Sequence, residues 1–99
     1  MKIVAVTACP TGIAHTYMAA EQLEKTGIAL GHEIKVETQG AMGIENELSS
    51  AEIAAADVAI FAVDIEVEQR ERFSGLRIIE VPAQLAIRDP HSIFARLDN

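Results

Sequence analysis

Cysteine and basic residues are scarce in this sequence, and each scarcity excludes a class of protein. The chain of 99 residues contains one cysteine, Cys9. A single cysteine excludes an internal disulfide and a zinc site built from several thiolates. Eight lysines and arginines stand against fifteen acidic residues, and the net charge of -7 argues against nucleic acid as a partner.

Long apolar runs are also missing. No stretch approaches the roughly 20 apolar residues that span a bilayer, and no basic region precedes a long apolar stretch at the N-terminus. We therefore expect neither a membrane span nor a secretory signal, and a protein that stays in the cytoplasm. Hydrophobic residues nevertheless make up 49% of the chain, too many for a disordered segment. At this length the sequence predicts a single domain over residues 1–99.

Four segments have the composition of β-strands. Residues 2–8 and 58–63 contain unbroken apolar runs, which are typical of central parallel strands buried on both faces. Residues 32–39 alternate between apolar and polar side chains, which predicts an edge strand, and residues 77–81 are mixed. The pattern predicts an α/β fold of three layers. We expect a doubly wound, four-stranded parallel sheet of order 2-1-3-4, with helices on both faces.

The segments between these strands carry helix signals. Helical spacing of apolar residues predicts a helix over residues 12–30, and a second is expected from Ser49 or Ser50 to Ala56. Glu52 stands three residues after Ser49, as a capping box requires. The other expected elements are a loop over residues 40–48, a short exposed helix over 66–73, and a helix over 82–97 that is broken near Asp89-Pro90.

Cys9 follows the first predicted strand and precedes the first predicted helix. In open parallel sheets a crevice forms at the carboxyl ends of the strands where the connections diverge, so we expect Cys9 and Asp64 to lie there. A helix N-terminus supplies unpaired N–H groups and the positive end of a dipole, which favour a thiolate. The same N–H groups can converge on an anion, with Gly12 permitting close approach of the backbone. Cys9 is therefore a candidate nucleophile that could carry a phosphoryl group.

Structural alternatives remain open for these residues. A lone cysteine at a strand end is often a small buried apolar residue, and Asp64 can simply cap the next short helix. Hydrogen bonds to phosphoryl oxygens could come from Thr11, Thr16 and His15. Alternatively, the two threonines are helix caps and His15 is a solvated residue of the first helical turn. Two further side chains, Tyr17 and Met18, are expected in the core.

Other cysteine and phosphate chemistries lack their residues here. A phosphatase loop needs an arginine six residues after its cysteine to hold phosphate bidentately, whereas His15 occupies that position and the first arginine is Arg70. The Walker and dinucleotide-binding motifs are absent as well. With no hydrolytic base evident, a phosphoryl group on Cys9 would be passed on instead of being lost to water.

Several stretches carry a resemblance to a known family. They are VTACPTGIAHTYMAAE at residues 6–21, KVETQGAMGIENEL at 35–48, Ala55-Ala56-Asp57, and VDIEV at 63–67 with Arg72-Phe73. Over about residues 2–81 the chain resembles the fructose-specific enzyme IIB component of the bacterial phosphoenolpyruvate-dependent sugar phosphotransferase system. The resemblance implies a four-stranded parallel sheet with helices on both sides.

The resemblance also implies a two-step relay through Cys9. A phosphohistidine on a IIA component would donate to Cys9, and the phosphocysteine would donate to fructose or a fructose-like sugar held by a membrane IIC component. The protein would then be a protein-phosphohistidine:sugar phosphotransferase without cofactor or metal, cytoplasmic and peripheral to the inner membrane through IIC. The alternative is a regulatory module whose phosphocysteine is read by a partner protein. The phosphate loop of the family corresponds to Pro10, Thr11, Gly12, Ile13, Ala14, His15 and Thr16, with Asp64 as a candidate supporting residue.

Overall fold

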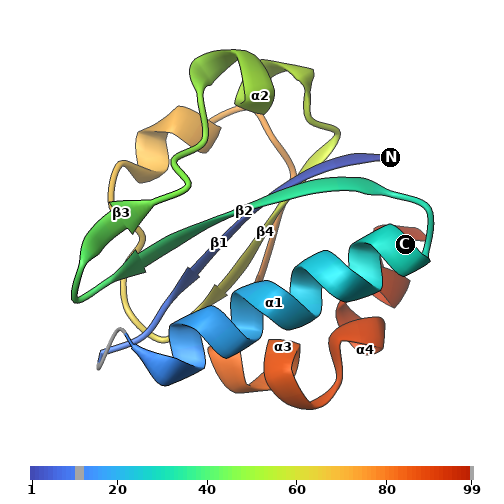
Figure 1. Ribbon diagram of the computed structural model, residues 1–99. Coiled ribbons are helices and arrows are strands. Elements are labelled where there is room, and N and C mark those ends of the chain that lie inside the picture. Colours follow the sequence, from blue (N-terminus) through green and yellow to red (C-terminus); the bar gives the residue numbers. More distant parts are fainter. Residues whose placement is uncertain (11–12, 99) are drawn as a thin grey trace.

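The two unbroken apolar runs lie side by side at the centre of one sheet. In the computed structural model, which describes residues 1–10 and 13–98, five strands are ordered β3-β2-β1-β4-β5 in a mixed α/β fold (Figure 1). The four parallel strands are β1 (Lys2–Ala8), β2 (Glu33–Gly40), β4 (Val58–Val63) and β5 (Ile78–Val81). The fifth, β3 (Gly43–Glu45), runs antiparallel to β2.

The prediction of a four-stranded, wholly parallel sheet is wrong, because the sheet has a fifth strand, β3, which is antiparallel. Residues 40–48 were expected to be a loop, but the chain turns back after β2 and pairs Gly40 with Gly43. Gly43 has a φ of 88°, in the left-handed region that glycine adopts at no steric cost. Because β3 covers the end of β2, that strand is not the outermost one there. The parallel strands alone follow β2-β1-β4-β5, which is the predicted order of the four.

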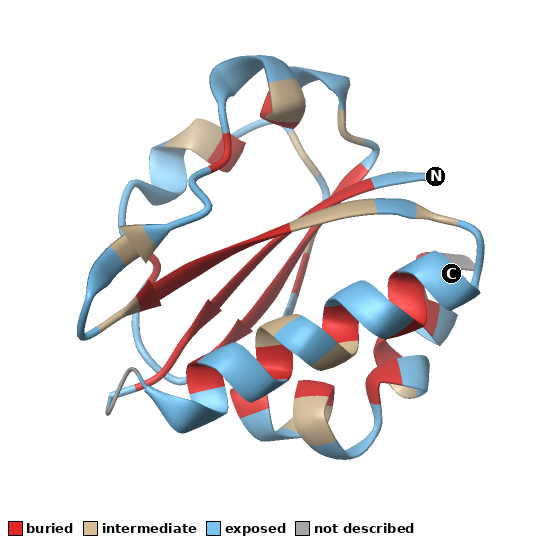
Figure 2. Cartoon of the chain, in the orientation of Figure 1, coloured by how far each residue is buried: buried red, intermediate tan, exposed pale blue. Residues whose placement is uncertain are grey.

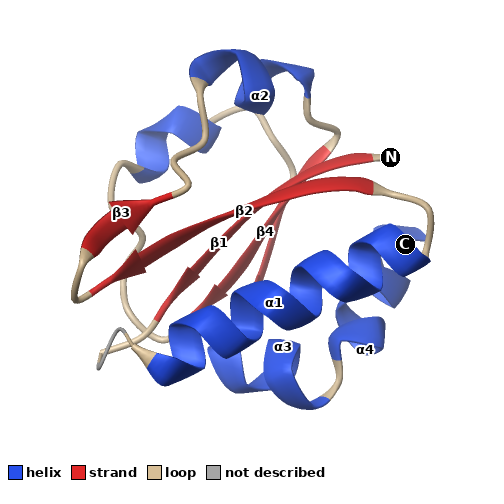
Figure 3. Cartoon of the chain, viewed as in Figure 1, coloured by secondary structure: helices blue, strands red, loops and turns tan. Residues whose placement is uncertain are grey.

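Helices cover both faces of the sheet, as expected. One face carries α1 (Ala14–Ala29), α3 (Ala83–Arg88) and α4 (Pro90–Ala95), and the other carries α2 (Ser50–Ala55) (Figure 3). The predicted break at Asp89-Pro90 is confirmed, because α3 ends at Arg88 and Pro90 begins α4. A single 3-10 turn, η2 (Arg96–Asp98), follows α4.

The exposed helix expected over residues 66–73 is wrong in extent and in burial. Only a 3-10 turn forms, η1 (Arg70–Phe73), and it lies on the same face of the sheet as α2. Phe73 is fully buried and its ring meets the ring of Phe61 edge to face, with centroids 5.0 Å apart. Because most residues of this segment are charged, its pattern did not indicate that Phe73 would be buried. The contact between Phe73 and Phe61 holds η1 against β4.

The core consists of two apolar clusters, one on each side of the sheet. Successive residues of β1 and β4 point to opposite faces, and both strands are buried on both faces, apart from Lys2 at the start of β1 (Figure 2). On the α1 side, Ile3 and Ala5 pack with residues that include Leu23 and Ile93. On the other side, Val4 and Val6 belong to the cluster that contains Phe73.

Three polar side chains of β2 are turned toward the α2 side of the sheet, and all three are at least partly buried. Lys35, Glu37 and Gln39 pair in register with Val4, Val6 and Ala8 of β1, and so share their face. Glu37 is fully buried and Gln39 nearly so. Lys35 donates to the carbonyl of Glu47 at 3.0 Å. These three side chains make hydrogen bonds to the segments that cross the α2 side of the sheet. Apolar side chains in their place could only pack against those segments.

Ser49 begins α2 with the capping box that the sequence predicts. Its hydroxyl accepts a hydrogen bond from the N–H of Glu52 at 3.1 Å, and the Glu52 carboxylate accepts one from the N–H of Ser49 at 2.8 Å.

We expect Ser49→Ala to lower the free energy of unfolding by about 1 kcal/mol, because the N–H groups at the start of α2 lose their partner. Urea unfolding followed by circular dichroism measures the change. Ser50→Ala, one residue further along, is the matched control and should change stability by less than about 0.5 kcal/mol. Equal losses in the two variants would contradict the capping assignment.

Candidate functional site

Cys9 lies at the carboxyl edge of the sheet, where the chain direction of the connections reverses. The preceding residue, Ala8, pairs with Gln39 of β2 on one side and with Val63 of β4 on the other. The N–H of Asp64, which follows β4, donates to the carbonyl of Ala8 at 2.9 Å. The first connection leaves β1 toward β2 and the next crosses to β4, so this is the switch point of the sheet. Cys9 and Asp64 therefore lie next to each other at the carboxyl ends of the two central strands.

The sulfur of Cys9 is in contact with the first turn of α1. Its Sγ lies 2.9 Å from Oγ1 of Thr16, the third residue of that helix. Thr7 on β1 donates from its hydroxyl to the carbonyl of Thr16 at 3.0 Å, and both threonines are fully buried. These two contacts fasten the start of α1 to the end of β1. The sulfur therefore lies near the N–H groups and the positive dipole end of a 16-residue helix.

The burial of Cys9 bears on the alternative of a small apolar core residue. The residue is only 4% exposed, as such a residue would be. Its sulfur nevertheless contacts the hydroxyl of Thr16, which can donate to a thiolate. This polar contact separates Cys9 from an inert cysteine packed against hydrocarbon.

The other predicted residues of the loop are placed unequally. Pro10, Ile13, Ala14 and His15 are exposed, and Thr16 is buried against the sulfur. Thr11 and Gly12 lie outside the described residues. Ile13 is the N-cap of α1 and supplies no side-chain cap to it. An exposed His15 in the first turn is compatible with donation to a bound anion and with simple solvation.

Asp64 has a structural partner. Its Oδ1 accepts a hydrogen bond from the N–H of Ala83, the first residue of α3, at 3.2 Å. The alternative that Asp64 caps the next short helix is wrong: η1 has no side-chain cap, and Asp64 instead binds the start of α3. The carboxylate links the end of β4 to the start of α3.

Tyr17 and Met18 correct the prediction that both belong to the core. They are 40% and 47% exposed. The Tyr17 hydroxyl donates to the carboxylate of Glu45 on β3, and this hydrogen bond is the main cause that raises the pKa of Tyr17. Three more large apolar side chains are exposed in segments at this edge of the sheet: Ile13, Met42 and Ile65.

Thr16→Val tests the contact with the thiol. Valine keeps the volume of threonine and removes the hydroxyl, so a Cys9 thiolate would lose one hydrogen-bond donor. We expect alkylation of Cys9 by iodoacetamide at pH 7 to slow about tenfold, which corresponds to roughly 1.4 kcal/mol. Thr16→Ser keeps the hydroxyl and should react at nearly the wild-type rate. A valine variant that reacts as fast as the serine variant would show that the hydroxyl does not stabilise the thiolate.

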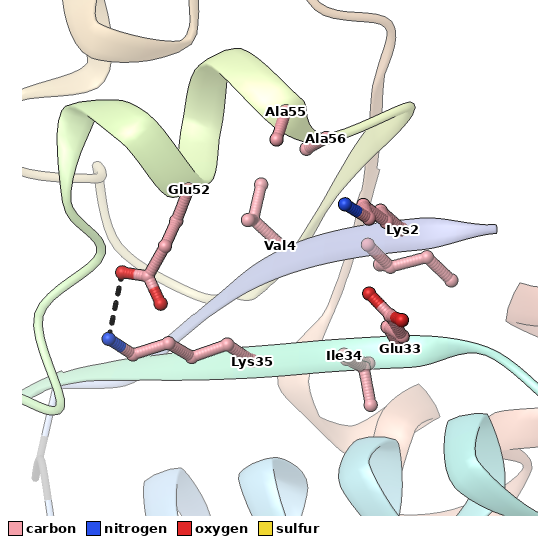
Figure 4. Close-up of a pocket in the computed structure, with 9 residues that line it drawn as sticks. Lys2, Val4, Glu33, Ile34, Lys35, Glu52, Ala55 and Ala56 are labelled. Carbon is pink, nitrogen blue, oxygen red and sulfur yellow. Dashed lines mark hydrogen bonds and ion pairs between the residues drawn. The ribbon is translucent and has the colours of Figure 1, made fainter.

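The cavity in Figure 4 lies away from Cys9. It has a volume of about 240 Å³ and opens at the amino ends of β1 and β2, beside α2. Lys35 and Glu52 form an ion pair in it at 2.9 Å. The hydrogen bond from Lys35, followed by that from the N–H of Ser49, lowers the pKa of Glu52 to about 2. These two charged groups are paired with each other, and Cys9 is not among the residues that line the cavity.

Within residues 1–10 and 13–98, no group of three or more histidine, cysteine, aspartate or glutamate side chains is placed to hold a metal ion. No helix in this part of the chain is both long enough and apolar enough to cross a bilayer.

The fold and the thiol together define a class of protein: doubly wound α/β domains with a cysteine at the switch point, in the loop between a central strand and a helix. Comparison with known proteins makes the assignment specific. The chain matches the family described as PTS system, lactose/cellobiose specific IIB subunit, over residues 4–96. It therefore belongs to the IIB family of the sugar phosphotransferase system. The match continues well beyond residue 81, where the resemblance was expected to fade.

The relatives of this chain include free and fused proteins. The PTS system fructose-like EIIB component 2 of Escherichia coli is 48% identical over 97 residues, which cover 98% of this chain and 92% of that protein. The PTS system fructose-specific EIIABC component of Bacillus subtilis is 50% identical over 98 residues, which cover 99% of this chain and 15% of that protein. A domain of the fructose-specific IIABC component of Borrelia burgdorferi has a solved structure with a TM-score of 0.90 and 47% identity. Its alignment covers 95% of this chain and 89% of that domain.

Proposed function

We propose that this chain acts as a single IIB domain that relays a phosphoryl group through Cys9. A phosphohistidine of a IIA component donates the group, and fructose or a fructose-like sugar bound by a membrane IIC component receives it. The observation that carries the proposal is the 2.9 Å contact between Sγ of Cys9 and Oγ1 of Thr16 at the first turn of α1. It supports a thiol in a polar, anion-favouring setting within a family of sugar phosphotransferase components.

Each step of the relay exchanges one bond to phosphorus for another. In the first, the sulfur of Cys9 attacks phosphorus, the S–P bond forms and the P–N bond to the donor histidine breaks. The thiol proton ends on the imidazole nitrogen that phosphorus leaves. In the second, a sugar hydroxyl attacks phosphorus, the O–P bond forms, the S–P bond breaks, and the hydroxyl proton ends on the sulfur.

The protein contributes position and charge stabilisation to both displacements. The proposed cradle for the equatorial phosphoryl oxygens consists of backbone N–H groups in the loop over residues 10–16. Pro10 belongs to this loop but has no N–H group, so the donors are those of Thr11, Gly12, Ile13, Ala14, His15 and Thr16. Fixed backbone dipoles stabilise the charge on a transferring phosphoryl group and need no reorganisation at the moment of reaction. Asp64 supports this edge through its bond to Ala83.

The names of the relatives and the surface around Cys9 support the proposed partners. The Bacillus subtilis relative is named as an EIIABC component, in which IIA and IIC parts accompany the IIB part. Exposed apolar side chains at the edge that carries Cys9, including Ile13, Met18 and Ile65, would suit docking of such partners. We therefore place the protein in the cytoplasm, at the inner membrane through IIC.

The relay is tested with a fructose-family IIA domain phosphorylated on histidine. We expect the intact mass of the purified chain to increase by one phosphoryl group, and this group to appear on fructose when membrane vesicles carrying IIC are added. A chain that never gains the group would overturn the proposal. If the protein keeps its phosphoryl group when IIC and sugar are present, the result would favour the regulatory alternative, in which a partner protein recognises the phosphocysteine.

A further inference from the structure

Gln39 holds the segment that follows β4 by both of its side-chain groups. Its Oε1 accepts from the N–H of Glu68 at 2.8 Å, and its Nε2 donates to the carbonyl of Glu68 at 3.2 Å. One side chain thus binds both backbone groups of one residue, as a neighbouring strand would. The same Nε2 donates to Oε2 of Glu37 at 2.8 Å, and Gln39 is only 4% exposed.

The position of this clamp relative to Cys9 follows from the sheet order. β1 lies between β2, which carries Gln39, and β4, after which Glu68 comes. The chain that leaves β4 must therefore pass the end of β1 to bring Glu68 to Gln39. Gln39 and Ala8 are partners in the register, so the clamp lies beside the residue that precedes Cys9. Val67, next to Glu68, is 3% exposed and packs in the same cluster as Ala8.

A second anchor closes the network on the other side of Glu68. Gln69 has a φ of 57°, a left-handed conformation that is uncommon outside glycine, and it starts η1. Arg72 donates from Nε to the carbonyl of Gln69 at 3.0 Å. Its Nη1 and Nη2 donate to the two carboxylate oxygens of Glu37 at 3.0 and 2.9 Å. The ring of contacts runs from Glu37 through Gln39, Glu68, Gln69 and Arg72 back to Glu37.

We propose that Gln39 is a positioning residue for Cys9: by fixing the backbone of Glu68 beside Ala8, it holds the end of β1 that carries the sulfur. This inference rests on the proposed function for its kinetic consequence, since Gln39 itself touches no reacting atom. Displacement of a nucleophile by an ångström lowers the rate of an in-line transfer steeply. Firm clamping of a segment with a strained backbone residue, beside the residue that precedes the thiol, is what such a demand requires.

Gln39→Met is the variant that tests the inference, because methionine keeps the length of glutamine and removes all of its hydrogen bonds. We expect hydrogen exchange of the Glu68 N–H to accelerate at least tenfold. In single-turnover reactions with a phosphohistidine IIA domain, we expect the maximal rate of phosphorylation to fall about tenfold, while the half-saturating donor concentration stays within twofold. Alkylation of Cys9 by iodoacetamide should accelerate about fivefold, because the sulfur is less confined.

Two controls separate positioning from general weakening. Glu68→Ala removes an exposed side chain and keeps the backbone groups that Gln39 binds, so all three rates should match wild type. Ser49→Ala lowers stability at a distance from Cys9 and should leave both Cys9 reactions unchanged. If Gln39→Met does not fold, Gln39→Asn, which is one methylene too short to reach Glu68, takes its place.

The outcomes are distinct. A Glu68 N–H that exchanges faster while both Cys9 reactions stay within twofold of wild type would overturn the inference. A loss confined to the half-saturating donor concentration would also overturn it, since the segment would then serve docking alone. If the wild-type chain accepts no phosphoryl group, the proposed function fails, and the alkylation rates still decide whether Gln39 positions the sulfur.

Discussion

Cys9→Ser is expected to reduce phosphoryl acceptance at least about a thousandfold, to the background of the assay. Serine places an oxygen where the sulfur lies and retains the possibility of a hydrogen bond to Thr16, so the fold around it persists. What it lacks is an easily ionised group, because a hydroxyl is a far weaker nucleophile than a thiolate near neutral pH. Intact mass after incubation with the phosphohistidine IIA domain measures the loss.

His15→Gln is the control for this result, since His15 is the one histidine of the loop and an imidazole nitrogen can also take a phosphoryl group. His15 is exposed in the first turn of α1, six residues after Cys9. We expect the glutamine variant to accept a phosphoryl group within about tenfold of the wild-type rate. Acceptance that survives Cys9→Ser and disappears in His15→Gln would identify the histidine as the acceptor and remove the cysteine relay.

Arg72→Met is expected to lower the free energy of unfolding by about 3–5 kcal/mol at pH 7. Glu37 is fully buried, and its carboxylate is paired bidentately with a guanidinium whose side chain is 17% exposed. Methionine keeps the packing over Phe73, where the guanidinium lies 5.0 Å from the ring centre, and leaves a buried charge without its partner. Urea unfolding monitored by circular dichroism measures the difference.

The same pair predicts how stability depends on pH. Burial, the largest single influence, raises the pKa of Glu37, but the hydrogen bonds from Arg72, Leu48 and Gln39 together outweigh it and the pKa lies below its usual 4.5. A lowered pKa adds stability that is complete above about pH 4.5 and is lost as the pH falls through the folded-state value. In Arg72→Met the carboxyl group can protonate at little cost, so the difference between the two proteins should shrink in acid.

Arg70→Met is the matched control, with the same substitution in the same 3-10 turn. Arg70 pairs with Glu80 at 2.8 Å, but both side chains are more than 40% exposed. An exposed pair contributes little because water already solvates both charges, so we expect a loss below about 1 kcal/mol with little dependence on pH. Equal losses at Arg70 and Arg72 would contradict the importance assigned to burial of Glu37.

The sheet could be predicted from sequence because its central strands are apolar on both faces. The runs at 2–8 and 58–63 leave no alternative to burial, and two buried strands with intervening helices fix most of the topology. The strand β3 was not predicted because three residues are too few to show a periodicity, and the glycines near it indicated only a turn. The hairpin becomes visible only once β2 offers an edge to pair with.

The buried polar row of β2 could not be predicted from local pattern. Alternation separates Lys35, Glu37 and Gln39 from their apolar neighbours, and polar residues on one side of a strand usually face water. Glu37 is buried because Arg72 lies 35 residues further along and folds back onto it. Nothing in the alternation of a strand indicates a partner at that distance.

The position of Cys9 in the fold could be predicted from the sequence. The side-chain contacts around it could not. Cys9 follows a strand and precedes a helix, which is enough to put it at the switch point. Thr7 was missed because a threonine in an apolar strand has the composition of an ordinary β residue, and its bond to Thr16 depends on the docking of α1. Tyr17 and Met18 were assigned to the core because helical spacing does not show where the sheet ends.

The central claim is that the phosphoryl group is carried on the sulfur of Cys9. Residues 3–25 form one tryptic peptide that contains Cys9 and His15 and every residue of the loop between them. We expect tandem mass spectrometry of this peptide, taken from wild-type protein charged by the phosphohistidine IIA domain, to place the added mass on Cys9. A peptide without the added mass, or with that mass on His15, would contradict the account.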